Sequence, residues 1–319
     1  MNSATGPVGM ISNPGSGHNR DRFGALEARI DACTTIRHRI TRSAADIEPA
    51  LRDLQREGIR ALAVNGGDGT ASAVLGCLLE QRIFDIPPPV ILLPGGTANM
   101  NAGDVGMRAP LDKAVRRLCR WAGAGEPPRA VERRAIMRVA GGGSAPRYGM
   151  FLGAGAVIHG TEYAHEEIHS RGLRDDFSLA LGTARTVWGV LRGDPRFNRH
   201  VEIDLAANGQ PARRFDTLIL AVSTLQRLSF GMRPFFGSGE GAIRCTVFEQ
   251  GCTRFARTFV SIVRGRPNRN ATPESGYHSF NTDTLTLRMD GRLNLDGELF
   301  DCRGELALSA SEPLEFLQL

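Results

Sequence analysis

The sequence predicts two domains, a parallel α/β domain followed by an antiparallel β domain. Strands alternate with helices through roughly the first third of the chain, and glycine-containing loops follow three of these strands. After the Gly/Pro-containing segment Ala122–Pro128, short strand-like runs are separated by turn residues. A chain of 319 residues is also long for a single core. We therefore assign residues 1–125 to the first domain, 126–305 to the second, and 306–319 to a C-terminal strand.

The first domain is expected to begin with a short apolar strand and to continue as βαβ units. The helix that opens at Ser43 has Asp46 three residues later, which is a capping-box pattern, and it stops at Gly58. The expected strands cover residues 7–11, 35–40, 59–64 and 90–93, and the expected helices cover residues 20–30, 43–58, 71–79 and 112–121.

The second domain reads as strands with two helical interruptions. The strand-like runs cover residues 130–139, 148–158, 201–205, 215–223, 242–248, 284–289 and 292–295. The helical segments cover residues 175–191 and 252–263, and residues 312–319 alternate again like a final strand.

Composition and charge exclude several classes of protein. Apolar residues make up 41% and charged residues 23% of the chain, which is typical of a globular protein. The net charge of +5 permits an anionic partner, but no Lys/Arg block or aromatic-basic repeat indicates nucleic acid. Lys113 is the only lysine and lies in neither a GxxxxGK[ST] loop nor a protein-kinase motif, so both classes fit poorly.

The sequence shows no targeting signal and no cysteine motif that would indicate a metal site or a redox site. The six cysteines are scattered without a CxxC pair, which favours reduced thiols in a cytosolic protein. We see no signal peptide, and no run approaches the 18 or so apolar residues of a membrane span.

The stretch Ala61–Thr70 (ALAVNGGDGT) is the one around which we expect the chain to be organised. A short apolar strand runs into a loop of three glycines and Asp68, and a helix follows. Glycines allow backbone N–H groups to approach an anion, and a helix N-terminus adds about half a positive charge. Asp68 would suit a metal ion or a hydroxyl group. The simpler interpretation is a tight Asp-Gly turn before a helix.

Two further loops occupy equivalent positions. One follows the first strand (Asn13–Gly17, NPGSG), and the other follows the strand at residues 90–93 (Pro94–Asn99, PGGTAN). Ligands of parallel sheets bind beyond the carboxyl ends of the strands. Three such loops at one edge therefore indicate a binding site more strongly than any one of them.

A second acidic group occurs at Asn294–Glu298 (NLDGE). An Asp-Gly pair between strands is the strongest short signal for a hairpin turn, and the local sequence favours that structure. If the segment were extended, Asp296 and Glu298 would project to the same face and could bind magnesium or accept a proton.

With these motifs in order along nearly the whole chain, the sequence resembles the diacylglycerol kinase catalytic-domain family. These lipid kinases include bacterial soluble diacylglycerol, sphingosine and ceramide kinases. The loops at Asn13–Gly17, Gly66–Thr70 and Pro94–Asn99 are similar to the family's NPxSG, GGDGT and P-x-GT-x-N motifs, and Asp296–Glu298 is similar to its late DGE. Gly231–Pro234 also lies where the family has a loop.

The resemblance implies a nucleotide-binding α/β domain, a C-terminal antiparallel β-sandwich that covers the lipid, and a site in the cleft between them. It also implies that the final strand returns to the first domain or the hinge. Two departures stand out. Met100 replaces an aspartate that usually follows the loop asparagine, which affects loop packing. An aspartate that often contributes to an auxiliary magnesium site in the second domain is either replaced by Glu240 or absent, which affects that site.

The residue roles implied by the resemblance are those of an ATP- and magnesium-dependent kinase. Asp68 would hold magnesium directly or through water, and Asp296 or Glu298 would accept the proton of the lipid hydroxyl, with Asp68 as the competing candidate base. The nucleotide site would be formed by Asn13, Ser16, Gly17, Thr41, Gly66, Gly67, Gly69, Thr70, Gly96, Thr97 and Asn99.

The acceptor is less clear from the sequence. Ceramide, diacylglycerol and sphingoid bases cannot be separated by pattern. An apolar group either packs in the core or forms a lip for acyl chains or membrane docking; it consists of Leu228, Phe230, Met232, Phe235 and Phe236. Arg185 and Arg192 share a helix face that is either solvated or turned to anionic head groups, and His165 and His169 lack a metal-binding motif.

The expected setting is a cytoplasmic protein in transient contact with the inner membrane face, with ATP and a lipid as partners, no nucleic acid, and a homodimer left open. Two alternatives remain. An NAD kinase-like enzyme shares GGDGT but should carry an N-x-G-x-LGF-type motif, which we do not find. A non-catalytic nucleotide- or lipid-binding protein would have no need of the acids.

Overall fold

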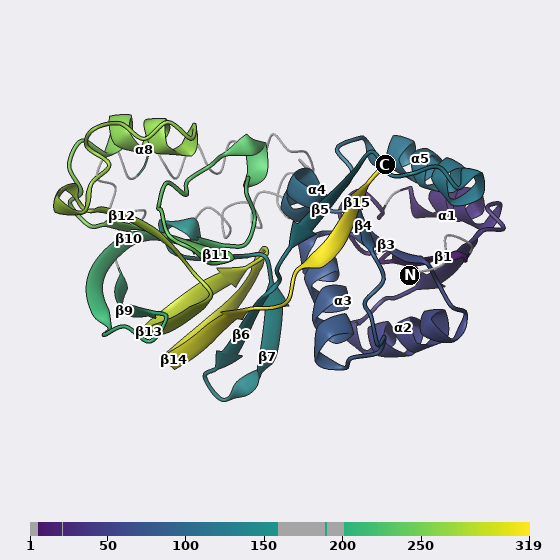
Figure 1. Ribbon diagram of the computed structural model, residues 1–319, viewed down its shortest axis with the longest axis horizontal. Coiled ribbons are helices and arrows are strands. Elements are labelled where there is room, and N and C mark those ends of the chain that lie inside the picture. The colour runs from purple at the N-terminus through teal and green to yellow at the C-terminus, as the bar shows by residue number, and fades with distance from the viewer. Residues whose placement is uncertain (1–5, 21, 159–188, 190–200) are drawn as a thin grey trace. The chain divides into compact units, whose positions relative to one another are not determined.

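The computed structural model describes residues 6–20, 22–158, 189 and 201–319, and the chain divides into two compact units (Figure 1). The first unit comprises residues 1–134 and 312–319, and the second comprises residues 135–311. The sequence placed the boundary earlier, after residue 125. The difference arises because strand β5 (Ala130–Arg134) pairs antiparallel with strand β15 (Leu314–Gln318) of the first unit.

The first unit is built on a six-stranded sheet with the order β2-β1-β3-β4-β15-β5. All neighbouring pairs are parallel except β15 and β5, as the alternation of strands and helices predicted. The C-terminal strand β15 returns to this sheet and lies beside β4 (Figure 1). The remaining strands are β1 (Val8–Ser12), β2 (Ile36–Ile40), β3 (Ala61–Gly66) and β4 (Val90–Pro94).

Helices cover both faces of this sheet. Side chains of α1 (Phe23–Asp31) and α5 (Leu111–Ala124) share one core cluster with β1, β3 and β4. On the other face, Gly9 has no side chain and thereby leaves room for Leu54 of α2 (Ile47–Arg56), which contacts α3 (Asp68–Glu80). The predicted capping box of Ser43 and Asp46 is present at the turn Ala44–Asp46 (η1). A short helix, α4 (Met100–Val105), was not predicted.

The second unit is an antiparallel β domain. Nine strands form one sheet with the order β12-β11-β10-β8-β13-β14-β6-β7, and β9 pairs with β10 and β13. The strands are β6 (Met137–Gly141), β7 (Ser144–Gly149), β8 (Phe151–Gly155), β9 (Val201–Ala207), β10 (Arg213–Ser223), β11 (Ile243–Glu249), β12 (Tyr277–Thr282), β13 (Thr284–Leu295) and β14 (Glu298–Ala310). The sequence missed β12 and β14 and divided β13 into two runs.

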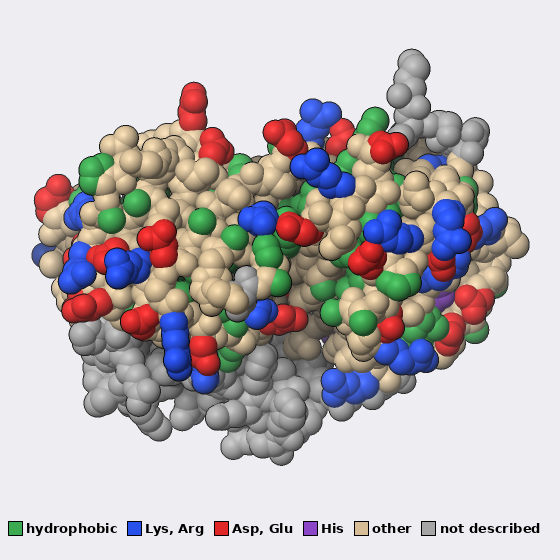
Figure 2. Space-filling model, turned by 90° about the horizontal axis from the view of Figure 1, so that it is seen from below, with side chains coloured by type: hydrophobic (Ala, Val, Ile, Leu, Met, Phe, Trp, Pro, Cys, Tyr) green, Lys and Arg blue, Asp and Glu red, His purple; other side chains and the backbone are tan. Residues whose placement is uncertain are grey.

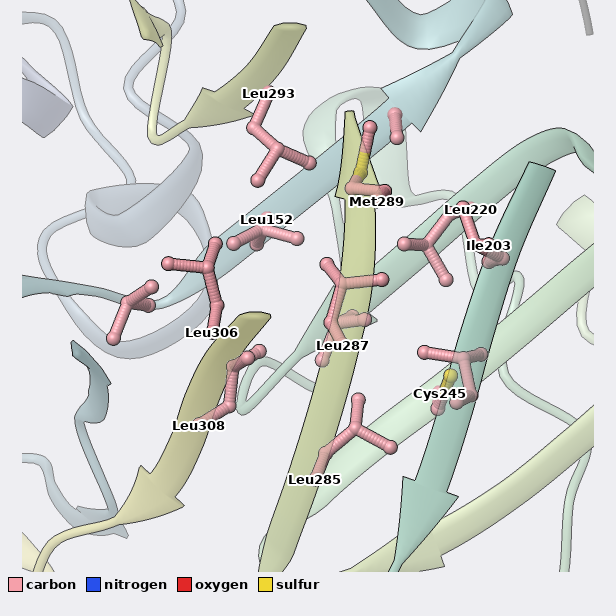
Figure 3. Close-up of a cluster of buried hydrophobic side chains, with 14 of the residues drawn as sticks. Leu152, Ile203, Leu220, Cys245, Leu285, Leu287, Met289, Leu293, Leu306 and Leu308 are labelled. Carbon is pink, nitrogen blue, oxygen red and sulfur yellow. The ribbon is translucent and has the colours of Figure 1, made fainter. Parts of the chain in front are cut away.

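The core of this unit shows that the sheet curves on itself. Leu306 and Leu308 of β14 belong to the same buried cluster as Leu220 of β10 and Cys245 of β11, although these strands are not neighbours (Figure 3). Leu287 of β13 lies between the two groups in Figure 3. The side chains on one face of the sheet therefore form the apolar core of this unit, and they alternate along the strands with side chains that face away from the core.

The helices of the second unit are few among the described residues. Helix α8 (Phe255–Val263) falls within the predicted segment 252–263, and two short turns, η2 (Ser229–Gly231) and η3 (Pro273–Ser275), connect strands. The predicted helix 175–191 lies outside the described residues, as do His165, His169, Arg185 and Arg192. No helix of the described part has both the length and the apolar character that crossing a membrane requires.

Candidate functional site

The three glycine-containing loops meet at one edge of the first sheet. Strands β1, β3 and β4 are adjacent and parallel, so their carboxyl ends lie together (Figure 1). The backbone joins these ends directly, since the N–H of Asn13 donates to the carbonyl of Asn65 (2.9 Å) and the N–H of Gly95 donates to the carbonyl of Gly66 (3.1 Å). The sequence-predicted loops are therefore neighbours in space.

Side chains of the first two loops form a connected set of hydrogen bonds. Asn13 Nδ2 donates to Thr70 Oγ1 (3.0 Å), and the hydroxyl of Ser16 lies 3.3 Å from the same oxygen. The N–H of Gly67 in turn donates to Ser16 Oγ (3.2 Å). These residues hold the NPGSG loop against the start of α3.

The glycines allow the loops to approach one another closely. A methyl group at Gly96 would lie 2.3 Å from the Cα of Gly67, and one at Gly17 would lie 2.5 Å from Thr97 Oγ1. Both distances are well inside van der Waals contact, so no other residue fits these two positions without moving a loop. Gly96 and Gly17 therefore have a packing role whether or not a ligand is bound.

Asn99 closes the third loop on itself. Its backbone is left-handed, with φ of 47°. The N–H of Gly96 donates to Asn99 Oδ1 (2.8 Å), and Asn99 Nδ2 donates to the Gly96 carbonyl (2.7 Å). Asparagine tolerates this conformation better than most residues and can make both bonds.

Asp68 joins the GGDGT loop to helix α4. One carboxylate oxygen accepts the N–H of Met100 (2.9 Å) and the other accepts the N–H of Asn101 (2.8 Å), which are the first amides of α4. The residue is only 9% exposed. Burial raises the pKa of the carboxyl group, and the two amide bonds act in the opposite direction.

Two of the residues that the sequence assigned to a nucleotide site lie at the start of α3. Gly69 and Thr70 lie in the first turn of this helix, where N–H groups have no acceptor within the helix. Gly66 belongs to strand β3, and its missing side chain leaves room for Thr70. A methyl group at Gly66 would lie 2.6 Å from Thr70 Cβ. Thr41 follows β2 with a buried side chain, and its N–H donates to the Ser12 carbonyl (2.9 Å).

The donor set limits how a magnesium ion could bind. Within the described residues, no group of three or more His, Cys, Asp or Glu side chains could hold a metal ion. Each oxygen of the buried Asp68 carboxylate accepts one amide, which leaves each oxygen one further lone pair. Magnesium in kinases is held largely by substrate phosphates and water, and a contact through water remains compatible with the residues present.

The second acidic group forms a hairpin turn, as the local sequence favoured. Asp296 (φ 49°) and Gly297 (φ 93°) are the two turn residues, and Leu295 pairs with Glu298 across the β13–β14 hairpin. The expectation that Asp296 and Glu298 share a face required an extended segment and is wrong. The left-handed turn gives the two acids different surroundings.

Asp296 is buried and Glu298 is exposed. The Asp296 carboxylate, 5% exposed, accepts the N–H groups of Met150 (2.8 Å) and Phe151 (2.9 Å) at the start of β8. The side chain of Glu298 forms no hydrogen bond or ion pair within the described part of the chain. Of the two acids, only Glu298 offers a carboxylate that is accessible to solvent.

Sequence reasoning missed a buried polar network beneath the loops. Ser12 Oγ accepts from Asn65 Nδ2 (3.3 Å) and lies 2.8 Å from Nε2 of His38. Asn19 Nδ2 donates to the Asn13 carbonyl (2.8 Å). Burial is the main cause of a lowered pKa of His38. The available signal was a polar residue, Asn65, at the end of an otherwise apolar buried strand.

The part of the chain that contains the three loops is similar to known proteins. Residues 7–123 match the family model of the diacylglycerol kinase catalytic domain. Curated relatives from Salmonella heidelberg (strain SL476) and Salmonella agona (strain SL483), both named "Probable lipid kinase YegS", are 32% identical over 107 residues. This region is 34% of the chain and 36% of each relative, so the match spans about a third of the relatives' length.

Solved structures extend the likeness to the whole fold. Two proteins from Bacillus anthracis strain Sterne, one of them described as a diacylglycerol kinase, align with TM-scores of 0.61 and 0.67. The alignments cover 98% and 99% of this chain and 96% of each of the two chains, at 12% and 13% identity. Residues 7–123 therefore match the model of the diacylglycerol kinase catalytic domain, and the chain as a whole shares the fold of these bacterial proteins.

Proposed function

We propose that the protein is a kinase that transfers a phosphoryl group from ATP to a hydroxyl group of a lipid. The observation that carries this proposal is the match of residues 7–123 to the diacylglycerol kinase catalytic domain, which contains all three glycine loops. Within the lipids, ceramide and diacylglycerol are the acceptors we propose to test first.

The nucleotide phosphates would bind at the start of α3. The amide of Gly69 lies there, Gly66 and Gly67 directly precede the helix, and the first turn favours negative charge. A phosphate that took the N–H of Gly67 would replace its bond to Ser16 Oγ. The hydroxyl groups of Thr70 and Thr97 complete this set. Phosphoryl transfer depends mainly on positioning and on neutralising charge, and this arrangement can provide both.

The loops around this position would hold it in shape. Asn13 and Ser16 border it through their bonds to Thr70, Gly17 and Gly96 permit the close approach, and Asn99 closes the third loop. Thr41 is a weaker proposal, because its side chain is buried at the end of β2. These residues bind and orient, and none needs to exchange a proton.

Glu298 is the general base in this proposal. A base must come within hydrogen-bond reach of the proton of the lipid hydroxyl, and an exposed carboxylate can do so without rearrangement of the protein. Glu298 is exposed and its side chain forms no hydrogen bond or ion pair with any residue that the structure describes, whereas the carboxylates of Asp68 and Asp296 are buried and each accepts two amides. We propose that the two aspartates hold the loops in place and that Asp68 interacts with magnesium through water.

The experiment is transfer of radiolabelled phosphate from ATP, with and without magnesium, to ceramide, diacylglycerol, sphingosine, phosphatidylglycerol and NAD. The proposal predicts one labelled lipid, with no label when Glu298→Gln replaces the wild type. Label in NAD would instead indicate the NAD kinase-like enzyme. No labelled product from folded protein that binds ATP would favour a non-catalytic binding protein.

A further inference from the structure

One segment of the second unit carries an excess of positive charge. Residues 225–271 contain eight arginines and two glutamates, a formal charge of +6. The whole chain has +5, so the remaining 272 residues together carry −1. On the face of the molecule drawn in Figure 2, by contrast, basic and acidic side chains lie interspersed. The positive charge of the chain is thus concentrated in this segment.

Many of these arginines pair with no acidic residue among those that the structure describes. In the first unit, exposed arginines such as Arg52 and Arg116 pair with Glu48 and Asp112. A set around α8 is exposed and forms no ion pair within the described part of the chain. It consists of Arg254, Arg257, Arg264, Arg266 and Arg269. Unpaired guanidinium groups gathered in one place favour an anionic partner.

Helix α8 presents one apolar and two basic side chains on its outer side. Thr258 and Ile262 point inward and are buried. Arg257, Val260 and Arg264 follow the spacing of three and four residues that places them on the opposite side, and all three are exposed. Val260 is 39% exposed although it is apolar.

A strained phenylalanine lies at the tip of the neighbouring loop. Phe230 has a left-handed backbone, with φ of 58°, and its side chain is 54% exposed. The N–H of Leu228 donates to the Met232 carbonyl (2.8 Å) and closes the tip. A bulky residue in this conformation is costly, and here burial of the ring does not compensate for the cost. Such an outlier suggests a function for the exposed ring.

The tip and α8 form one continuous surface. The N–H of Arg233 donates to the Val263 carbonyl at the end of α8 (2.8 Å). Gly265 packs against the Arg233 side chain, since a methyl group there would lie 3.2 Å from Arg233 Cδ. The loop that carries Phe230 and the C-terminal end of α8 are therefore in direct contact through Arg233.

We propose that this surface, formed by Phe230, Arg257, Val260, Arg264 and Arg266, docks on an anionic lipid membrane. Aromatic and aliphatic side chains enter the boundary between head groups and acyl chains, while arginines beside them attract lipid phosphates. The proposal deepens the proposed function, because a lipid acceptor resides in a membrane. Docking itself needs neither ATP nor catalysis.

The first test is sedimentation with vesicles in the absence of ATP. One vesicle preparation is phosphatidylcholine alone, and the other contains equal parts of phosphatidylcholine and phosphatidylglycerol. The full chain should bind the anionic vesicles, and added salt should weaken binding. The double variant Arg257→Ser/Arg264→Ser should bind about 25-fold more weakly, at about fivefold for each arginine near an anionic surface.

A matched double variant controls for net charge. Arg288→Ser/Arg303→Ser removes the same charge from exposed positions of β13 and β14, which pair in register with Glu305 and Asp290. Its vesicle binding should equal that of the wild type. An equal loss in both double variants would overturn the proposal, and so would equal binding to the two vesicle preparations.

The second test separates docking from folding. Glycine adopts the backbone of Phe230 without strain, so Phe230→Gly should keep or raise the melting temperature while weakening vesicle binding about tenfold. Ile86→Gly, which removes an exposed apolar side chain from the first unit, should leave binding unchanged. Undiminished binding by Phe230→Gly would contradict the proposal.

Other partners give distinct results. Double-stranded DNA bound as tightly as the anionic vesicles, or a salt-independent dimer that Phe230→Gly dissociates, would replace the membrane as the occupant and overturn the proposal. Sedimentation measures vesicle binding and not catalysis. The membrane proposal can therefore be tested even if the protein transfers no phosphate to a lipid.

Discussion

Asp68 in the first unit and Asp296 in the second are buried in the same way. Each carboxylate accepts two consecutive backbone N–H groups at the start of another element, α4 for Asp68 and β8 for Asp296. Their local structures differ. Asp68 opens a helix, whereas Asp296 is the left-handed residue of a hairpin turn.

The two aspartates show that an acid in a sequence motif can be engaged in hydrogen bonds to the backbone. Both aspartates were candidates for catalysis because they are acids in family motifs, yet both are engaged in connecting distant parts of the backbone. Glu298, two residues after Asp296, is exposed, and its side chain forms no hydrogen bond or ion pair with any residue that the structure describes. Position within a motif did not separate Glu298 from the two aspartates, whereas burial and hydrogen bonding do.

The largest expected effect is on turnover in Glu298→Gln. Loss of a positioned base typically costs about 100- to 10,000-fold, so transfer to the acceptor lipid should fall by that range. The free energy of unfolding should change by no more than about 0.5 kcal/mol, because the side chain is exposed and, among the described residues, forms no hydrogen bond or ion pair that the variant would lose. Initial rates and urea unfolding measure the two quantities. Wild-type turnover would remove Glu298 from the reaction.

Asp68→Ala should impair both stability and turnover. It leaves two buried amides of α4 without an acceptor, which costs about 2–5 kcal/mol of unfolding free energy. Urea unfolding checks the value against Asp85→Ala, an exposed aspartate of the same unit. Equal stability of the two variants would contradict the bonds described for Asp68.

At Asp296, asparagine and alanine should differ. Asparagine tolerates the left-handed turn and keeps one acceptor oxygen, whereas alanine loses both bonds and fits the turn poorly. We expect Asp296→Ala to lower the unfolding free energy by about 3 kcal/mol and Asp296→Asn by about 1–2 kcal/mol. The reverse order in urea unfolding would show that the turn and the amide bonds do not govern this position.

Gly96→Ala should disturb the meeting of the loops. The added methyl group would clash with the backbone of Gly67, and overpacking of this kind costs about 1–3 kcal/mol. ATP binding, measured by calorimetry, should weaken as the loops move. Gly103→Ala in α4 is the control, since nothing lies within 4 Å of its added methyl group. The same ATP affinity in both variants would argue against loop packing as the basis of the site.

The smallest effect is a pH dependence from His38. Its pKa is lowered from 6.5 in the folded protein by burial, so below that pH the unfolded chain binds more protons than the folded one. His38 therefore lowers stability as the pH falls through 6.5 toward the folded pKa. Replacing it with glutamine should flatten the dependence of the unfolding free energy on pH below about 6.5. An unchanged slope in His38→Gln would contradict its burial.

Much of the first unit could be predicted because its signals are local. The apolar run before Gly66 predicts strand β3, and the Ser43–Asp46 pattern predicts the start of a helix. Helix α4 was missed because it is short, and its first amides bind Asp68, 32 residues away. The run 130–139 was divided at Ala135 because β5 pairs with β15 near the C-terminus.

The features of the candidate site that depend on local sequence could also be predicted. Glycine loops after parallel strands identified the edge of the sheet, and the Asp-Gly pair identified the hairpin turn. The burial of Asp296 could not be predicted, because the amides that bind it are about 145 residues away along the chain. For the same reason, the sequence left open which acid is the base.

The most direct test of this account is the rate of phosphate transfer in Asp296→Asn compared with Glu298→Gln, with both variants folded and saturated with ATP. If Asp296 holds the hairpin and Glu298 accepts the proton, Asp296→Asn retains most of the wild-type rate and Glu298→Gln loses at least about 100-fold. The opposite order would contradict the account and assign the proton transfer to Asp296.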